Sequence, residues 1–475
     1  MVELFEDRMN QSDTTLWRIE RDPELRTTIL GMSLFDRTPD WTQLRERIEA
    51  VTWEIPRLRQ KVAAAPFGIG PPRWVPDPAF DLDYHLRRIV APEPGDLQTL
   101  LALGGPIVMA AFDRDRPLWE FTFVEGLADG KSALLQKIHH CATDGVGAIR
   151  MAQLLFDEHE QEHAPGDAAA QQGAPRERPR SSTVQVVADN LADQARDAAR
   201  LAGWSMTAVP KAASAAMLHP ARAASDAART ARSIIKLVRP ARTPLSSVMN
   251  GRGLSRRLAA MEISLDELRA AGHAGGGTMN DAFLAALTGG MRHYHVLHGV
   301  EPDHVRVTMP INLRKSDHDT IGNNRFTPAR FALPIDVTDP LLRMKQLGAL
   351  ARSWQHEPGL KYTDIVAGVL NALPEPMTAA ALGSMLKAID FVATNVPGLV
   401  GPAHLAGAAI ERQFAFAPTS GSAFSVALLS HLDVCTVGML IDISAVRDPD
   451  VLASCMADGF EEVLAVGRPV RSRRR

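Results

Sequence analysis

The stretch Ile138-His139-His140-Cys141-Ala142-Thr143-Asp144-Gly145 decides how this chain is interpreted. Before it lie two apolar runs rich in strand-forming residues, 118–126 (LWEFTFVEG) and 131–140 (KSALLQKIHH). The connection between these runs ends in Asp129-Gly130, and such a connection is typical of a β-hairpin. The sequence therefore predicts that the two histidines lie at the end of a hairpin strand.

His139 and His140 are adjacent in that strand, and successive side chains of a strand point to opposite faces. The two imidazoles therefore cannot face the same cavity: one is a candidate general base, and the other packs or bonds as part of the structure. Asp144-Gly145 then ends the strand, and the apolar residues of 146–156 recur at helical spacing. A histidine at a strand end, a sharp turn and a helix N-terminus together place a base beside exposed backbone N–H groups.

The pattern His-His-x-x-x-Asp-Gly resembles the signature of a large acyltransferase superfamily, which includes chloramphenicol acetyltransferase-like enzymes, condensation domains and plant acyltransferases. Further motifs narrow the resemblance; in chain order they are Pro117-Leu118-Trp119, Asn280-Asp281, Pro310-Ile311-Asn312-Leu313-Arg314, Gly322-Asn323-Asn324 and Asn395-Val396-Pro397-Gly398. Over nearly the whole chain they resemble the bacterial wax ester synthase/diacylglycerol acyltransferase family. The Asp-Phe-Gly-Trp-Gly element of the plant relatives is absent from the sequence, which argues against that branch. Residues 10–13 (NQSD) and 430–433 (SHLD) depart from the family's usual sequence.

The resemblance implies that the second histidine, His140, is the general base, and imidazole suits proton abstraction near neutral pH. It also implies that Asp144 holds the motif loop in shape, whereas the spacing alone equally allows Asp144 to cap the following helix. Gly145 permits a close approach of backbone or substrate. His139 is assigned to packing, and the motif residues Pro117, Leu118 and Trp119 are assigned to structural support.

Asn280 and Asp281 open a predicted helix at 278–298. Thr278 and Asp281 fit a capping pair, which accounts for Asp281 but not for Asn280. The Asn280 amide is a candidate donor to the developing oxyanion or to a substrate hydroxyl, and the resemblance favours this role. The motif that contains Asn395, Pro397 and Gly398 belongs to the structural support, and its residues predict a strand that ends in a type II turn.

Cys141 beside two histidines suggests a thiol nucleophile with a histidine base. Adjacent residues of a strand point apart, however, so direct acyl transfer is favoured over a covalent route. The histidines at positions 293, 295 and 298 form neither an i, i+4 pair nor an H-E-x-x-H motif, so no metal site is predicted. The absence of a G-x-S-x-G motif from the sequence argues against a serine esterase.

The composition, 45% hydrophobic and 23% charged over 475 residues, is typical of a globular protein of two domains. The N-terminal sequence lacks the apolar core of a signal peptide, and no apolar run approaches the roughly 18 residues of a membrane span. The three cysteines form no CxxC pair, which favours a reducing compartment. Residues 196–257 carry a charge of +10 although the whole chain carries −3. This segment is either a solvated basic helix or a binding site for an anionic partner, such as lipid headgroups, nucleic acid or a phosphorylated cofactor.

Strand and helix patterns alternate irregularly, which favours an α/β fold of mixed sheets (α+β-like) over a doubly wound sheet. Strands are expected at 27–35, 83–90, 256–263, 305–313, 325–336, 390–396, 422–429 and 434–443, and helices at 41–61, 97–112 and 448–466. Residues 158–179 are typical of a mobile linker, and residues 181–239 of a helical crossover. The predicted parts are an N-terminal domain (1–160), a linker and crossover (161–255) and a C-terminal domain (256–475). The resemblance implies two chloramphenicol-acetyltransferase-like domains with the active site in a channel between them.

The function implied by the resemblance is an acyl-CoA-dependent O-acyltransferase that esterifies diacylglycerol, long-chain alcohols, or both. Acyl-CoA is then the donor substrate, a lipid alcohol is the acceptor, and no permanently bound cofactor or metal is expected. The expected location is cytoplasmic, peripheral to the inner face of the membrane or to lipid droplets with anionic surfaces, with no nucleic-acid partner. Two alternatives remain open: a related acyltransferase that acts on another lipid or a secondary metabolite, and a non-catalytic protein that binds lipid surfaces. Release of free thiol from acyl-CoA would separate the enzymes from the binding protein.

Overall fold

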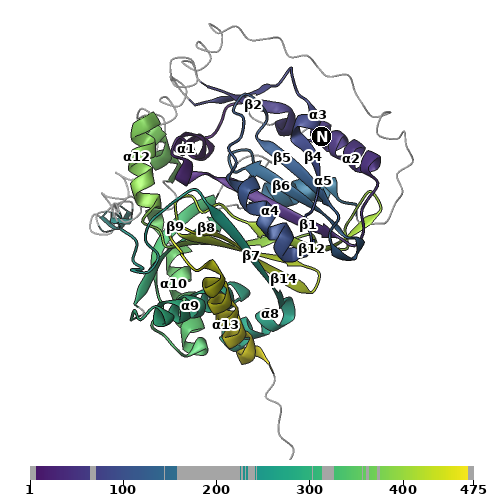
Figure 1. Ribbon diagram of the computed structural model, residues 1–475. Coiled ribbons are helices and arrows are strands. Elements are labelled where there is room, and N and C mark those ends of the chain that lie inside the picture. Colours follow the sequence, from purple (N-terminus) through teal and green to yellow (C-terminus); the bar gives the residue numbers. More distant parts are fainter. Residues whose placement is uncertain are drawn as a thin grey trace, which may run out of the picture.

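The computed structural model describes residues 7–64, 71–143, 145–157, 225, 228–230, 232–233, 241, 243–301, 303–312, 326–355, 357–359, 363–371 and 375–468. Within these residues the chain forms a mixed α/β fold with two six-stranded sheets that lie against each other, and helices cover their outer faces (Figure 1). The expected α/β class with mixed sheets is confirmed. A small two-stranded sheet of β2 (Gln60–Ala63) and β3 (Arg73–Pro76) stands beside the first large sheet.

The first sheet is built around the hairpin predicted from the motif. Its strands, in spatial order, are β11 (His404–Leu405), β12 (Ala408–Phe416), β1 (Thr28–Phe35), β6 (Ser132–His139), β5 (Trp119–Glu125) and β4 (Leu86–Val90). β5 and β6 pair antiparallel, which confirms the hairpin. In the connection, Asp129 and Gly130 have φ of 61° and 73°. Asp and Gly adopt this left-handed conformation more readily than most residue types.

The second sheet is formed by the later half of the chain. Its strands, in spatial order, are β7 (Arg256–Ser264), β14 (Val434–Asp442), β13 (Phe424–His431), β10 (Phe391–Pro397), β8 (His304–Asn312) and β9 (Phe326–Pro334). β10 runs parallel to both β8 and β13, whereas the other neighbours pair antiparallel.

Helices bury the remaining faces of the two sheets. One face of the first sheet packs against α2 (Trp41–Glu54) and α5 (Gly145–Leu155), and the other packs against α4 (Leu97–Met109), which also contacts β7. The outer face of the second sheet is covered by α8 (Leu265–Ala274), α9 (Met279–Leu297), α10 (Pro340–Gln355) and α13 (Pro449–Gly467) (Figure 1). At one side α1 (Gln11–Ile19) packs against α11 (Thr363–Asn371) and α12 (Glu375–Leu386). The short helical turns are η1 (Pro23–Leu25), η2 (Pro56–Arg59), α3 (Leu82–His85) and η4 (Ala128–Gly130).

Most predicted elements are present, but the structure differs from the prediction in several places. The strand expected at 83–90 starts later, because Asp81 accepts a hydrogen bond from the N–H of Asp83 and begins the turn α3. The elements that were not predicted are strands β2, β3, β11 and β12 and helices α1, α10, α11 and α12. The type II turn predicted at the end of the motif 395–398 is wrong. With Pro397 as its second residue, the turn needs a positive φ at its third residue, Gly398, and Gly398 does not have one.

The predicted domain limits remain a proposal. The first sheet also contains two strands from the part of the chain that the sequence assigned to the C-terminal domain. These strands are residues 404–405 and 408–416; they pair with each other, and the second also pairs with β1. The expected linker at 158–179 lies outside the residues that the structure describes, as does the expected crossover at 181–239 apart from six residues between 225 and 233.

Gly398 is expected to be intolerant of a side chain. A Cβ atom at this position would lie 2.1 Å from the carbonyl oxygen of Ser430 on the neighbouring strand β13, so the backbone would have to move. We expect Gly398→Ala to lower the free energy of unfolding by about 1–3 kcal/mol, measured by urea denaturation. The control is Gly401→Ala, since no atom lies within 4 Å of a Cβ built there. Equal stability of the two variants would contradict the prediction.

Candidate active site

A cavity of about 430 Å³ lies between the two large sheets. This volume falls within the roughly 300–1,000 Å³ typical of small-molecule sites. The first sheet contributes residues of β1, β6 and β12 to the wall, and the second sheet contributes residues of β8, β10 and β13. Residues of α1, α5 and α12 and the segment 417–420 complete it. The lining is mostly aliphatic and aromatic. Among the described lining residues, His140 is the sole titratable side chain.

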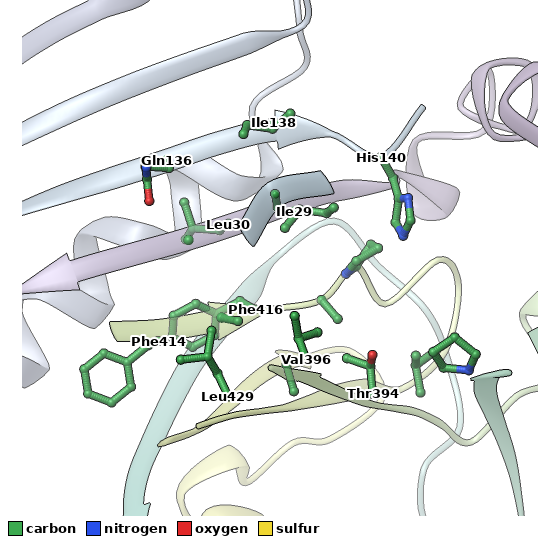
Figure 2. A pocket seen from close by; sticks show the side chains of 18 of the residues that line it. Ile29, Leu30, Gln136, Ile138, His140, Thr394, Val396, Phe414, Phe416 and Leu429 are labelled. Atoms are coloured by element: carbon green, nitrogen blue, oxygen red, sulfur yellow. The ribbon is translucent and has the colours of Figure 1, made fainter. Parts of the chain in front are cut away.

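His140 follows the last residue of β6, and its imidazole points across the cavity toward the strand that carries Thr394 and Val396 (Figure 2). Its backbone N–H donates to the carbonyl oxygen of Thr27 at 2.9 Å, so the sheet pairing continues to this residue. A candidate base is therefore fixed at the edge of the first sheet, with an apolar space in front of it.

His139 points to the opposite side, as the strand alternation predicted. Its side chain is fully buried, and its ring packs near Trp17 and Phe112. Nδ1 accepts a hydrogen bond from the backbone N–H of Cys141 at 3.0 Å, and Nε2 lies 3.0 Å from a carboxylate oxygen of Glu20. Because Nδ1 accepts from the Cys141 N–H, Nε2 is the ring nitrogen that can donate to the Glu20 carboxylate. His139 thus ties the turn after His140 to a buried acid.

Glu20 was not found by the sequence reasoning. One carboxylate oxygen accepts hydrogen bonds from the backbone N–H of Thr27 at 2.7 Å and from its hydroxyl at 3.2 Å, and the other faces His139. Burial opposes ionisation of this acid, but the imidazole of His139 and the hydrogen bonds from Thr27 lower the pKa of Glu20 to about 2. Glu20 therefore contacts two residues that position His140. One is Thr27, whose carbonyl oxygen accepts the backbone N–H of His140, and the other is His139, which precedes His140 in the chain.

Asn280 is connected to the cavity by a hydrogen bond with Asn395. Asn395 lines the cavity, and its side-chain N–H donates to the amide oxygen of Asn280 at 2.6 Å. Asp281 is buried and completes the predicted capping box, in which Thr278 and Asp281 each accept from the other's backbone N–H. The sequence prediction for Asp281 is thereby confirmed. Asn280 contacts the cavity through its partner and is not itself among the lining residues.

The motif Pro117-Leu118-Trp119 supports the base of the hairpin. The carbonyl oxygen of Leu118 accepts the backbone N–H of His139 at 3.0 Å. Trp119 is buried, donates through its indole N–H to the carbonyl oxygen of Leu58 at 2.8 Å, and stacks on His85. Pro117 is also buried. The supporting role expected for the motif stays a prediction.

Three other motif residues have different outcomes. Asp144 lies outside the residues that the structure describes, and Gly145 is the first residue of α5. Pro397 lines the cavity, which its expected supporting role did not include.

Several polar lining residues were missed at the sequence level: Ser33, Gln136, Thr308, Thr394 and Gln413. For two of them a signal existed. Gln136 lies four residues before His140 on the same predicted strand, so strand alternation places both on one face. Thr394 directly precedes Asn395.

Cys141 is 1% exposed, and burial raises the pKa of its thiol well above the ordinary value, which disfavours a thiolate nucleophile. We expect Cys141→Ala to retain most of the acyl-transfer rate. Intact-mass spectrometry of the wild-type protein after incubation with acyl-CoA alone should show no acyl adduct. A thioester on Cys141 would establish a covalent route instead.

The histidines at 293, 295 and 298 are engaged in separate contacts. His293 bonds Glu462, His295 bonds Ser246 and the Met291 carbonyl, and His298 bonds Asp448. In the described part of the chain, no group of three or more His, Cys, Asp or Glu side chains is placed to hold a metal ion. In the same part, no helix has both the length and the apolar character needed to cross a membrane.

The fold is that of known acyl-transfer and condensation domains. It is similar to the solved wax ester synthase/diacylglycerol acyltransferase from Marinobacter aquaeolei VT8, with a TM-score of 0.63 and 21% identity over 97% of this chain and 100% of that one. It is also similar to the starter condensation domain of rhizomide synthetase, solved in complex with C8-CoA and Leu-SNAC, with a TM-score of 0.59 and 12% identity over 97% and 94% of the two chains. The fold class expected from the sequence is thereby confirmed.

Sequence comparisons identify the family. The model of the wax ester synthase/diacylglycerol acyltransferase catalytic domain matches residues 9–283, and that of the family's C-terminal domain matches residues 322–463. A putative diacylglycerol O-acyltransferase of Mycobacterium tuberculosis (strain ATCC 25618 / H37Rv) is 35% identical over 97% of this chain and 92% of its own length. A probable diacylglycerol O-acyltransferase of the same strain is 29% identical over 91% and 89%. The chain belongs to the wax ester synthase/diacylglycerol acyltransferase family and is an acyltransferase, which confirms the family predicted from the sequence.

Proposed function

We propose that this protein transfers the acyl group of a long-chain acyl-CoA to the hydroxyl of a diacylglycerol, of a long-chain alcohol, or of both. The observation that carries the proposal is the placement of His140 as the sole titratable side chain among the described residues lining an apolar cavity. An apolar cavity suits the hydrocarbon chains of both substrates. Relatives described as diacylglycerol O-acyltransferases support the acceptor class, and the neighbouring domain solved with C8-CoA supports the donor class.

The proposed reaction is a direct transfer. His140 takes the proton of the acceptor hydroxyl, whose oxygen forms a bond to the thioester carbonyl carbon. The resulting oxyanion collapses and expels the thiolate of coenzyme A, which receives the proton from His140. No resident cofactor is required, because the thioester is already activated.

Two groups of donors are proposed to stabilise the oxyanion. The backbone N–H groups at the start of α5, from Gly145 onward, present the positive end of a helix. Thr394 and Asn395 line the opposite wall, and the side-chain N–H of Asn395 donates to the amide oxygen of Asn280 at 2.6 Å. In this proposal Asn280 acts as a positioning residue for Asn395. Asp144 is proposed to shape the loop between His140 and α5.

The test is an assay of free-thiol release with the purified protein, using palmitoyl-CoA with a diacylglycerol, a long-chain alcohol or no acceptor. The proposal expects acceptor-dependent release of coenzyme A together with formation of the matching ester, identified by mass spectrometry. Thiol release without ester would indicate a thioesterase. Absence of both activities with every acceptor would refute the proposal.

We further propose that the protein reaches its insoluble acceptors by binding anionic membrane or lipid-droplet surfaces through residues 196–257. Support comes from the charge of +10 over this segment, most of which lies outside the residues that the structure describes. Each basic residue near an anionic surface contributes on the order of 1 kcal/mol, so a few together give useful affinity. Replacing Arg229, Arg232, Lys236 and Arg239 with Gln should therefore weaken co-sedimentation with anionic vesicles and reduce activity on dispersed lipid.

The same fourfold variant should retain its activity on a short, soluble alcohol, which serves as the internal control. Vesicle binding by the wild-type protein should also weaken when the salt concentration is raised. If neither the substitution nor salt changes co-sedimentation, the segment is a solvated crossover.

A further inference from the structure

The cavity contains a buried amide that the proposed reaction does not use. Gln413 on β12 lines the cavity and is 6% exposed. Its side-chain N–H donates to the hydroxyl oxygen of Ser33 on β1 at 3.4 Å, and Ser33 is 1% exposed. The amide oxygen of Gln413 has no hydrogen-bond partner among the described residues. A buried acceptor without a partner is unfavourable, so its retention within a ligand cavity needs an explanation.

This amide lies far from the candidate base. Ser33 pairs with Gln413 on one side and with Leu134 of β6 on the other, so the three residues are at the same level of the first sheet. From Leu134 to His140 the strand advances six residues, or about 20 Å at the usual rise per residue. The cavity touches both His140 and Gln413, so it extends about this far along the sheet.

A second polar side chain lies between the two ends. Gln136 is on the same strand as His140 and is directed to the same side in Figure 2. It lies opposite Gly31 of β1, where a Cβ atom would come within 3.1 Å of the Gln136 amide oxygen. Because Gly31 has no side chain, the wall has room for the amide group of Gln136. The wall that begins at His140 continues through Gln136 to the pair of Ser33 and Gln413.

The hydrogen-bonding groups at the end of the cavity away from His140 indicate which part of a ligand would bind there. An alkyl chain there would leave the Gln413 oxygen unpaired, whereas a hydroxyl donates to that oxygen and can accept from the second amide N–H. We propose that Gln413 and Ser33 form a polar subsite for a hydroxyl carried by the substrate chain, about 20 Å from the reacting carbonyl. The inference rests on the proposed function and deepens it: the enzyme accepts ω-hydroxylated or far-chain-hydroxylated acyl groups or alcohols in preference to plain chains.

The test compares ω-hydroxypalmitoyl-CoA with palmitoyl-CoA in the wild-type protein and in Gln413→Met. Methionine keeps the length of the side chain and removes its polar atoms. For each protein, kcat/KM for ω-hydroxypalmitoyl-CoA is divided by kcat/KM for palmitoyl-CoA. This ratio should be about tenfold higher in the wild type than in Gln413→Met, because a buried hydrogen-bond acceptor disfavours a chain that has no hydroxyl to pair with it. Gln98→Met, at an exposed glutamine of α4, is the matched control and should keep the wild-type ratio. Equal ratios in wild type and Gln413→Met, both for the hydroxylated donor and for a hydroxylated acceptor, would overturn the proposal.

A second arm identifies which chain occupies the subsite. With palmitoyl-CoA as the donor, an α,ω-diol is compared with the plain alcohol of the same length; discrimination here, and not with the hydroxylated donor, assigns the subsite to the acceptor. If Gln413→Met instead weakens binding of free coenzyme A and of all donors equally, the amide contacts the pantetheine arm and the proposal is wrong.

Calorimetric binding of ω-hydroxypalmitate and palmitate separates the subsite from the reaction. Wild-type protein that discriminates between these acids but turns over no acyl-CoA supports the subsite and refutes the proposed function. Turnover without discrimination in either assay refutes the subsite alone.

Discussion

Replacing His140 with alanine is expected to lower kcat by roughly 10²–10⁴-fold, the usual contribution of a positioned general base. The physical reason is that the acceptor hydroxyl is a poor nucleophile unless its proton is removed as the bond to the carbonyl forms. Among the described residues that line the cavity, no other side chain is titratable and could replace the imidazole as the base. The measurement is the steady-state rate of ester formation with saturating donor and acceptor, together with the melting temperature of the variant.

Two other histidine substitutions make the result specific. His273→Ala removes an exposed imidazole from the last turn of α8, so its rate should match the wild type. His139→Ala removes a fully buried ring that faces Glu20, so it should act mainly by lowering the melting temperature. A folded His140→Ala protein with near-wild-type turnover would rule out the proposed base.

The parts of the site that the sequence predicted are those encoded by local pattern. The hairpin follows from two apolar runs around Asp129-Gly130, and the alternation of a strand then separates His139 from His140. The capping box of Thr278 and Asp281 is likewise contained within four residues. In each case the interacting groups are close in sequence, so residue type and spacing were sufficient to predict the geometry.

The missed parts depend on contacts between segments that are distant in sequence. Strand β12 contains the polar run Glu411-Arg412-Gln413, which obscures its apolar alternation, and its pairing with β1 joins opposite ends of the chain. Gln413 and Ser33 are 380 positions apart, so no local pattern relates them. Glu20 follows an unpredicted helix, and nothing near it in the sequence indicates His139 as its partner.

The most consequential of these missed contacts can be tested through stability and activity together. Glu20→Gln keeps the shape of the side chain but removes the charge, so an amide can no longer accept from Thr27 and face the Nε2 proton of His139 with two equivalent oxygens. The pKa of about 2 for Glu20 lies below the ordinary value for glutamate, and a shift of this size corresponds to about 3 kcal/mol. We therefore expect the variant to unfold at pH 7 with a free energy lower by about 3 kcal/mol, measured in urea.

The pH dependence gives the sign of the effect. Because the pKa of Glu20 is lower in the folded protein than in the unfolded chain, its stabilisation is fully present above the unfolded value of roughly 4.3 and is lost as the pH falls toward 2. The stability difference between the wild type and Glu20→Gln should accordingly shrink between pH 5 and pH 2. Glu46→Gln, at an exposed position on α2, is the matched control and should unfold at pH 7 with the free energy of the wild type.

Activity should fall as well, because Glu20 holds Thr27 and His139, whose backbone and side chain fix the segment around His140. Since a small displacement of a catalytic group can lower a rate by up to about 10²-fold, we expect kcat of folded Glu20→Gln to fall by about tenfold or more. KM for both substrates should change little, since Glu20 is not among the residues that line the cavity. A variant that loses stability but keeps the wild-type kcat would show that the carboxylate supports the fold without positioning the base.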